Sequence, residues 1–186
     1  MTNNAITPGS LTAIANRDGM SLAESFLNCE IIVLIDQSES MSAMDAPGGK
    51  SRFDAADSEL MQLQRAHPGK VAVVAFSTTV VFCPGGIPDR LRKSTNMSAA
   101  LDFVHMADGV SKIVLISDGR PDSEEATLKA ARRFRSPIHT IYIGPKGGRG
   151  AAFLARLAAA TGGRTFKSAA PGLLAESADE ILLLAA

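Results

Sequence analysis

The sequence predicts an α/β fold in which helices cover both faces of a mostly parallel sheet. Short apolar runs rich in β-branched residues recur along the chain, and stretches with helical spacing separate them. The runs are continuous rather than alternating, which is typical of strands that are buried on both faces. Strands that alternate with helices in this way indicate parallel β-α-β units, and therefore a three-layer α/β/α sandwich.

The individual elements follow from these patterns. Buried strands are expected at residues 30–35, 70–76, 112–117 and 137–143. Helices are expected at residues 53–66, 97–106, 123–134 and 150–160. The run at residues 77–82 follows its predecessor almost at once, so we expect it to pair antiparallel as one short edge strand. Another short strand is predicted at residues 164–168.

The two ends of the chain do not continue this alternation. We interpret residues 1–29 as an N-terminal extension and residues 30–186 as the domain itself. Within the extension, Ser21 and Glu24 have the spacing of a capping box, which predicts a short helix at residues 21–27. At the other end, an apolar stripe after Pro171 predicts a last helix at residues 171–185.

Charge and composition exclude several classes of protein. Nineteen Lys and Arg residues balance nineteen Asp and Glu residues, so no net field favours nucleic acid or an anionic membrane. The two cysteines and three histidines are scattered without metal-ligand spacing, which argues against a zinc site. The chain shows no signal peptide and no apolar run of about 20 residues, so we expect a soluble, cytoplasmic protein.

Oxygen-bearing side chains follow the predicted strands. Asp36, Ser38 and Ser40 occupy alternate positions directly after the first strand. Asp118 follows the third buried strand, and Thr95 lies just before a predicted helix. Because the carboxyl ends of parallel strands meet at one edge of a sheet, we expect these five side chains to converge. All are hard oxygen donors, which suit Mg²⁺ or Mn²⁺.

Such a site predicts a binding function. A divalent cation held by two carboxylates and neutral hydroxyls stays electrophilic and keeps a position for another ligand. We therefore expect the ion to bind a carboxylate of a partner protein. For each segment alone, the alternative is that Asp and Ser cap a helix or a turn. Their recurrence in three separate segments favours the metal site.

These segments resemble those of von Willebrand factor type A domains. "VLIDQSESM" is similar to the family's D-x-S-x-S loop, "STNMSAAL" to its threonine loop and "IVLISDGRPD" to its third loop. "IYIGPKGGRGAAFLARLAAATGGRTF" resembles the closing strand, helix and G-G turn of the family. The resemblance runs from about residue 30 to the C-terminus. It implies a Rossmann-like domain with a metal-ion-dependent adhesion site that binds proteins.

The resemblance also implies roles for the site residues. By position, the hydroxyls of Ser38, Ser40 and Thr95 contact the ion directly. Asp36 and Asp118 act largely through water. The sequence departs from the family at "KS", residues 93 and 94, where many members have glycines.

Other functions fit the sequence less well. "GGKS" at residues 48–51 imitates part of a P-loop, but Met44 occupies the position of the first required glycine. An aspartyl phosphatase needs a second acid where this chain has Ser38. We therefore expect no enzyme. The remaining alternative is a structural or assembly subunit whose site is filled or vestigial. The expected partner is a protein that supplies a carboxylate to the metal, for instance in a multiprotein assembly or as an ATPase that pairs with this chain.

Overall fold

A mixed six-stranded sheet lies at the centre of the protein, in the order β3-β2-β1-β4-β5-β6. The computed structural model describes residues 6–46, 48–88, 90, 93–109, 111–145 and 147–167. The strands are β1 (Ile31–Asp36), β2 (Val71–Phe76), β3 (Val80–Phe82), β4 (Lys112–Ser117), β5 (Ile138–Tyr142) and β6 (Thr165–Lys167). All neighbouring pairs are parallel except β2 and β3, which are antiparallel. The predicted sheet, with its single antiparallel edge strand, is confirmed.

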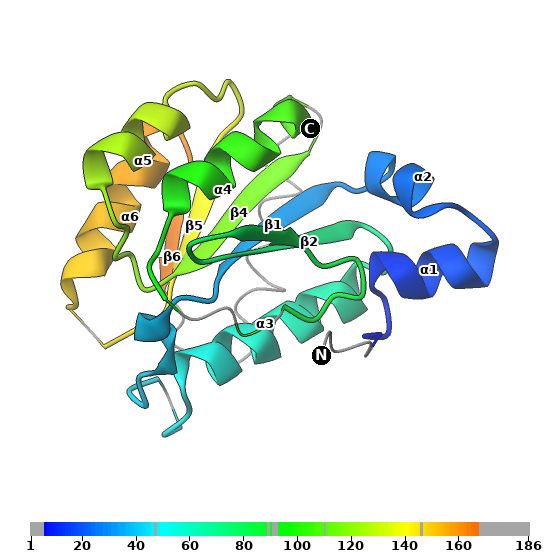
Figure 1. Ribbon diagram of the computed structural model, residues 1–186, viewed down its shortest axis with the longest axis horizontal. Coiled ribbons are helices and arrows are strands. Elements are labelled where there is room, and N and C mark those ends of the chain that lie inside the picture. Colours follow the sequence, from blue (N-terminus) through cyan, green and yellow to red (C-terminus); the bar gives the residue numbers. More distant parts are fainter. Residues whose placement is uncertain are drawn as a thin grey trace.

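Helices lie on both sides of the sheet, with α3 on one side and α4, α5 and α6 on the other (Figure 1). The helices are α1 (Leu11–Asp18), α2 (Leu22–Leu27), α3 (Arg52–Ala66), α4 (Met97–Val104), α5 (Glu124–Ala131) and α6 (Arg149–Ala160). Two 3₁₀ turns, η1 (Glu39–Ser42) and η2 (His105–Ala107), follow β1 and α4. The three-layer α/β/α architecture is therefore as predicted.

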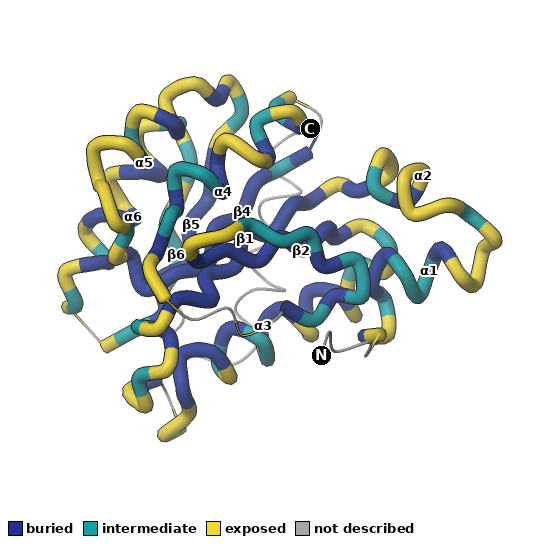
Figure 2. Tube along the Cα trace, viewed as in Figure 1, coloured by how far each residue is buried: buried dark blue, intermediate teal, exposed yellow. Residues whose placement is uncertain are grey.

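The side chains of the central strands divide between two cores. Alternate residues of β1 point to opposite faces of the sheet, so Ile32 and Leu34 join the core under α4 and α6. Ile31, Val33 and Ile35 join the core under α3. All six residues of β1 are buried, and Figure 2 shows the sheet as the buried centre of the molecule. Burial on both faces explains why this strand reads as a continuous apolar run.

The N-terminal segment packs against the end of α3 and the loop after β3. Thr7 donates a backbone hydrogen bond of 2.9 Å to Gly85, and Gly69 donates one of 2.8 Å to Gly9. The capping box of α2 is present, since Glu24 and Ser21 bond reciprocally. The sequence analysis missed α1, although Ser10 caps its start and Gly19 ends it. The proposed boundary between residues 29 and 30 stays a prediction.

Two further points concern the ends of the chain. The predicted last helix, residues 171–185, and residue 168 of the predicted final strand lie outside the described residues. Within the described residues, no helix is both long enough and apolar enough to cross a bilayer.

The core assignment predicts a contrast between two leucines. Leu34 is fully buried in the central strand, whereas Leu27 at the end of α2 is 75% exposed. Leu34→Ala should lower the free energy of unfolding by about 2–5 kcal/mol, because it leaves a cavity between sheet and helices. Leu27→Ala, the matched control, should change it by less than about 0.5 kcal/mol. Urea denaturation measures both values, and similar losses for the two variants would contradict the assignment.

Candidate metal-binding site

The strand order creates a switch point between β1 and β4. The chain leaves β1 for β2 on one side and later returns to β4 on the other side. In open α/β sheets, the crevice outside the carboxyl ends of such strands is the usual place for a ligand. Asp36 is the last residue of β1, and Asp118 follows the last residue of β4. Both predicted carboxylates therefore lie at the switch point.

Asp36 is fixed by its neighbours on both sides. The register of β1 with β4 pairs Ile35 with Ile116, so Asp36 lies beside Ser117. The Ser117 hydroxyl donates to Asp36 Oδ2 at 2.6 Å, and the Ser38 backbone N–H donates to Oδ1 at 2.8 Å. Asp36 is completely buried, so its orientation is set by these two hydrogen bonds.

The first loop brings two hydroxyls together. Ser38 Oγ and Ser40 Oγ lie 3.2 Å apart, which fits the expectation that alternate residues share one side of the loop. Glu39 between them is exposed. Gln37 is fully buried, and its side-chain amide has no hydrogen-bond partner among the described residues. The two serine hydroxyls thus lie together, whereas Gln37 and Glu39 differ in burial.

Thr95 is held by the third loop. Its backbone N–H donates to Asp122 Oδ1 at 2.8 Å, and the Asp122 N–H donates back to the Thr95 carbonyl at 3.0 Å. The backbone N–H of Glu39 also donates to the carbonyl of Lys93 at 3.0 Å, which joins the first and second loops. Lys93 has φ of 95°, the only positive φ of a non-glycine residue among those described. A glycine adopts this conformation without strain, so the departure from the family pattern at this position has a cost in the backbone.

The sequence analysis missed a basic residue at the site, Arg52. It is the first residue of α3, and only 4% of its side chain is exposed. Its guanidinium makes a bidentate pair with Asp45, at 2.7 and 2.6 Å, and Nη1 donates to Asp118 Oδ2 at 2.5 Å. The same Nη1 donates to the Ser40 carbonyl at 3.3 Å. Arg52 therefore joins the first loop to the third.

Asp118 keeps one oxygen unpaired. Its Oδ1 is buried and has no hydrogen-bond partner among the described residues. The backbone around it is packed closely against α6, because a Cβ at Gly150 would lie 1.8 Å from the Asp118 carbonyl oxygen. Gly119, with φ of +73°, allows the turn that directly follows. A buried carboxylate oxygen without a partner is costly, and a bound cation would satisfy it.

The donor set fits a hard divalent cation. Hydrogen bonds join the first loop to the second and the second to the third. Arg52 bridges Ser40 and Asp118, so the loops that carry the predicted residues lie at one edge of the sheet, the rim of the site. The described residues contain no group of three or more His, Cys, Asp or Glu that could hold a metal. The predicted set has only two carboxylates, and its other members are hydroxyls. Such a set suits Mg²⁺ or Mn²⁺ rather than zinc.

Burial dominates the electrostatics of Asp36. It raises the pKa of Asp36 from 3.8 to about 6, because the loss of hydration outweighs the hydrogen bonds from Ser117 and Ser38. The negative charge of Asp118 acts in the same direction. Two buried carboxylates close to one another favour a cation between them.

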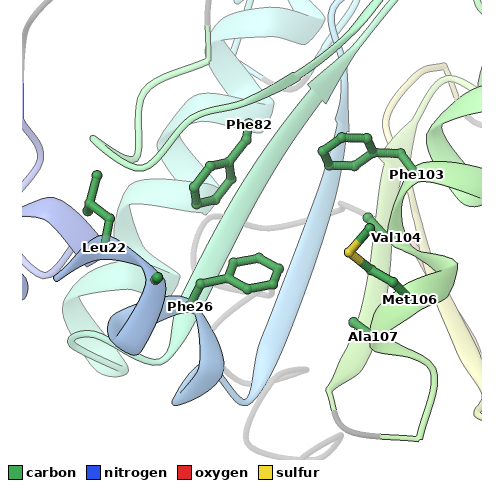
Figure 3. A pocket seen from close by; sticks show the side chains of 8 residues that line it. Leu22, Phe26, Phe82, Phe103, Val104, Met106 and Ala107 are labelled. Carbon is green, nitrogen blue, oxygen red and sulfur yellow. The ribbon is translucent and has the colours of Figure 1, made fainter.

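An apolar groove lies away from this rim. This groove of about 310 Å³ is lined by apolar side chains of α2, β3, α4 and η2, among them Phe26, Phe82 and Met106 (Figure 3). The rings of Phe26 and Phe82 meet edge to face at 5.4 Å. The element α2 leads into β1 and η2 precedes β4, so the groove lies toward the amino ends of these strands. Its lining offers no side-chain oxygen for a hard divalent cation.

Comparisons with known proteins give a likeness of fold. No family model and no curated protein sequence matches the chain. An aerotolerance-related membrane protein from Bacteroides fragilis, with multiple mutations to serine, has a TM-score of 0.66 at 15% identity, over 82% of this chain and 97% of that one. A von Willebrand factor type A protein from Catenulispora acidiphila gives 0.60 at 15% identity, over 83% of this chain and 42% of that one.

A metal-loaded structure is also similar. The manganese-loaded TRAP protein of Plasmodium vivax gives a TM-score of 0.50 at 15% identity, over 72% of this chain and 63% of that one. At such identities the likeness concerns the fold alone.

The raised pKa of Asp36 predicts a pH dependence in the metal-free protein. The folded state holds the proton more tightly than the unfolded state, so this stabilisation is complete below about pH 3.8 and lost above about pH 6. Asp36→Asn removes the buried charge and keeps the shape. Above about pH 7 it should raise the free energy of unfolding by about 1–3 kcal/mol, with a smaller gain near pH 4.

Urea denaturation with a chelator present measures this effect. Asp54→Asn is the control, because Asp54 is exposed and the hydrogen bond from Ser51 lowers its pKa. The control should show no gain in stability. An Asp36→Asn variant no more stable than the wild type at neutral pH is the contrary result.

Proposed function

Because the chain has the von Willebrand factor type A fold, we propose that it is a metal-dependent protein-binding module. In this proposal the site at the carboxyl ends of β1 and β4 holds Mg²⁺, with Mn²⁺ as a substitute. The ion, when bound, supplies a Lewis-acid centre that accepts a carboxylate oxygen of a partner protein. The observation that carries the proposal is the buried, unpaired Oδ1 of Asp118 on the same rim as two adjacent serine hydroxyls.

Each of the five predicted site residues has a role in this proposal. The hydroxyls of Ser38, Ser40 and Thr95 are the direct donors. Asp36 and Asp118 supply the negative charge that attracts the cation, largely through water. Ser117 and Asp122 hold Asp36 and Thr95 in place through the hydrogen bonds described above.

Binding is favoured over catalysis by what the loops lack. Residues 37–51, 93–96 and 118–123 contain no histidine or cysteine to act as a general base or a nucleophile. Both oxygens of Asp36 already accept hydrogen bonds, and one oxygen of Asp118 is bound to Arg52. We therefore propose that the protein is not an enzyme.

One observation favours a second candidate function. The guanidinium of Arg52 already places a positive charge on Asp118. If that charge replaces the metal, the chain is a structural or assembly subunit that uses the fold without metal-dependent binding. Metal binding by the purified protein distinguishes the two.

The test uses two serines of the same loop. Mg²⁺ should bind the wild type in calorimetry and raise its melting temperature, because ligands that bind only the folded state stabilise it. Ser40→Ala removes a donor hydroxyl and should weaken the binding by about tenfold or more. Ser42 is exposed and its hydroxyl bonds to the Glu39 carbonyl, so Ser42→Ala should bind as the wild type does.

A partner assay completes the test. Retention of a partner protein on the immobilised chain should require the divalent ion and be lost with chelator. If the wild type binds neither Mg²⁺ nor Mn²⁺, the assembly-subunit function replaces this proposal.

A further inference from the structure

Arg52 is the charged group at the rim that the proposed set of metal donors does not use. Its side chain is almost completely buried and directs its guanidinium to Asp45, to Asp118 and to the Ser40 carbonyl. Both partners in the pair with Asp118 are buried, at 4% and 1% exposure. An ion pair of this kind is screened little by water or salt.

The buried charges of the rim therefore do not match a divalent cation. Asp36 and Asp118 are both negative and buried, and the buried Arg52 offsets one of them. Asp45, the other partner of Arg52, is 38% exposed, so water screens its charge more strongly. The interior of the site therefore carries about one negative charge, which offsets only half of the charge of Mg²⁺ or Mn²⁺. A carboxylate from another molecule would balance the rest.

We propose that the buried charge of Arg52 weakens binding of the bare ion and so strengthens the dependence of metal binding on carboxylate binding. The inference rests on the proposed function and adds the regulation of the same site. With Arg52 against Asp118, the site binds the bare ion weakly, and a carboxylate from the partner tightens it. Because such coupling is reciprocal, the ion tightens the binding of the carboxylate by the same factor.

A purely structural role for Arg52 predicts something different. If Arg52 only ties the first loop to Asp118, its removal loosens the site and weakens metal binding. If its charge opposes the ion, removal leaves Asp118 as a buried carboxylate without a partner, and the ion binds more tightly. The sign of the change in affinity separates the two roles.

The experiment measures Mn²⁺ and Mg²⁺ affinity by calorimetry on the full chain, at neutral pH and in buffer without carboxylates. Arg52→Met keeps an unbranched side chain and removes the charge, and should bind the ions about tenfold more tightly than the wild type. Arg52→Lys keeps the charge and should stay close to the wild type. Arg133→Met is the matched control, because Arg133 forms an exposed ion pair with Asp102, and should leave affinity unchanged.

A second variant keeps the test valid if Arg52→Met does not fold. Asp45→Asn leaves Arg52 and its contact with Asp118 in place. It removes the negative charge of Asp45, which otherwise offsets part of the positive charge of Arg52. It should weaken metal binding by about threefold or more. An unchanged or tighter affinity in Asp45→Asn would overturn the inference.

Acetate serves as the probe for the partner's carboxylate. About 100 mM acetate, compared with chloride at equal ionic strength, should tighten metal binding by the wild type and do so less for Arg52→Met. If the wild type binds metal but Arg52→Met binds it equally or more weakly, the inference is wrong and the proposed function stands. If the wild type and Arg52→Met both bind no metal, both are wrong.

Discussion

The parallel register of β1 with β4 is the constraint on which the site depends. Strands buried on both faces fix this register, because a slip by one residue would exchange the side chains that enter the two cores. With the register fixed, Asp36 meets Ser117, and Asp118 emerges one residue later. The carboxylates at the switch point are thus placed by the same packing that stabilises the sheet. The candidate site and the core therefore depend on the same pair of strands.

The burial of the two carboxylates determines the electrostatics of the rest of the rim. Asp36 loses hydration and accepts two hydrogen bonds from the part of the chain that the structure describes. Within that part, Asp118 is bound to Arg52 through one oxygen and its other oxygen has no partner. The contacts made on folding do not fully replace the hydration that these carboxylates lose, which is common at functional sites. In the proposed function the cation and the partner's acid complete the compensation. The exposed apolar groove on the α4 side has no such electrostatic demand.

The sequence was a good guide to the sheet and a partial one to the site. Continuous apolar runs predicted β1, β2, β4 and β5, because burial on two faces leaves a simple pattern. The helix α1 was missed because few of its residues, such as Leu11 and Ala15, enter the core. Asp36 and Asp118 could be placed from strand ends alone. Arg52 could not, since its contacts depend on the path of residues 39–51, which no periodicity predicts.

The location of the ion tests the account most directly. Crystals grown with Mn²⁺ and measured for its anomalous scattering would locate the metal without assumptions about ligands. The account predicts one manganese position in contact with the hydroxyls of Ser38, Ser40 and Thr95. Manganese found only at exposed acids such as Glu39, or no manganese at all, would contradict it.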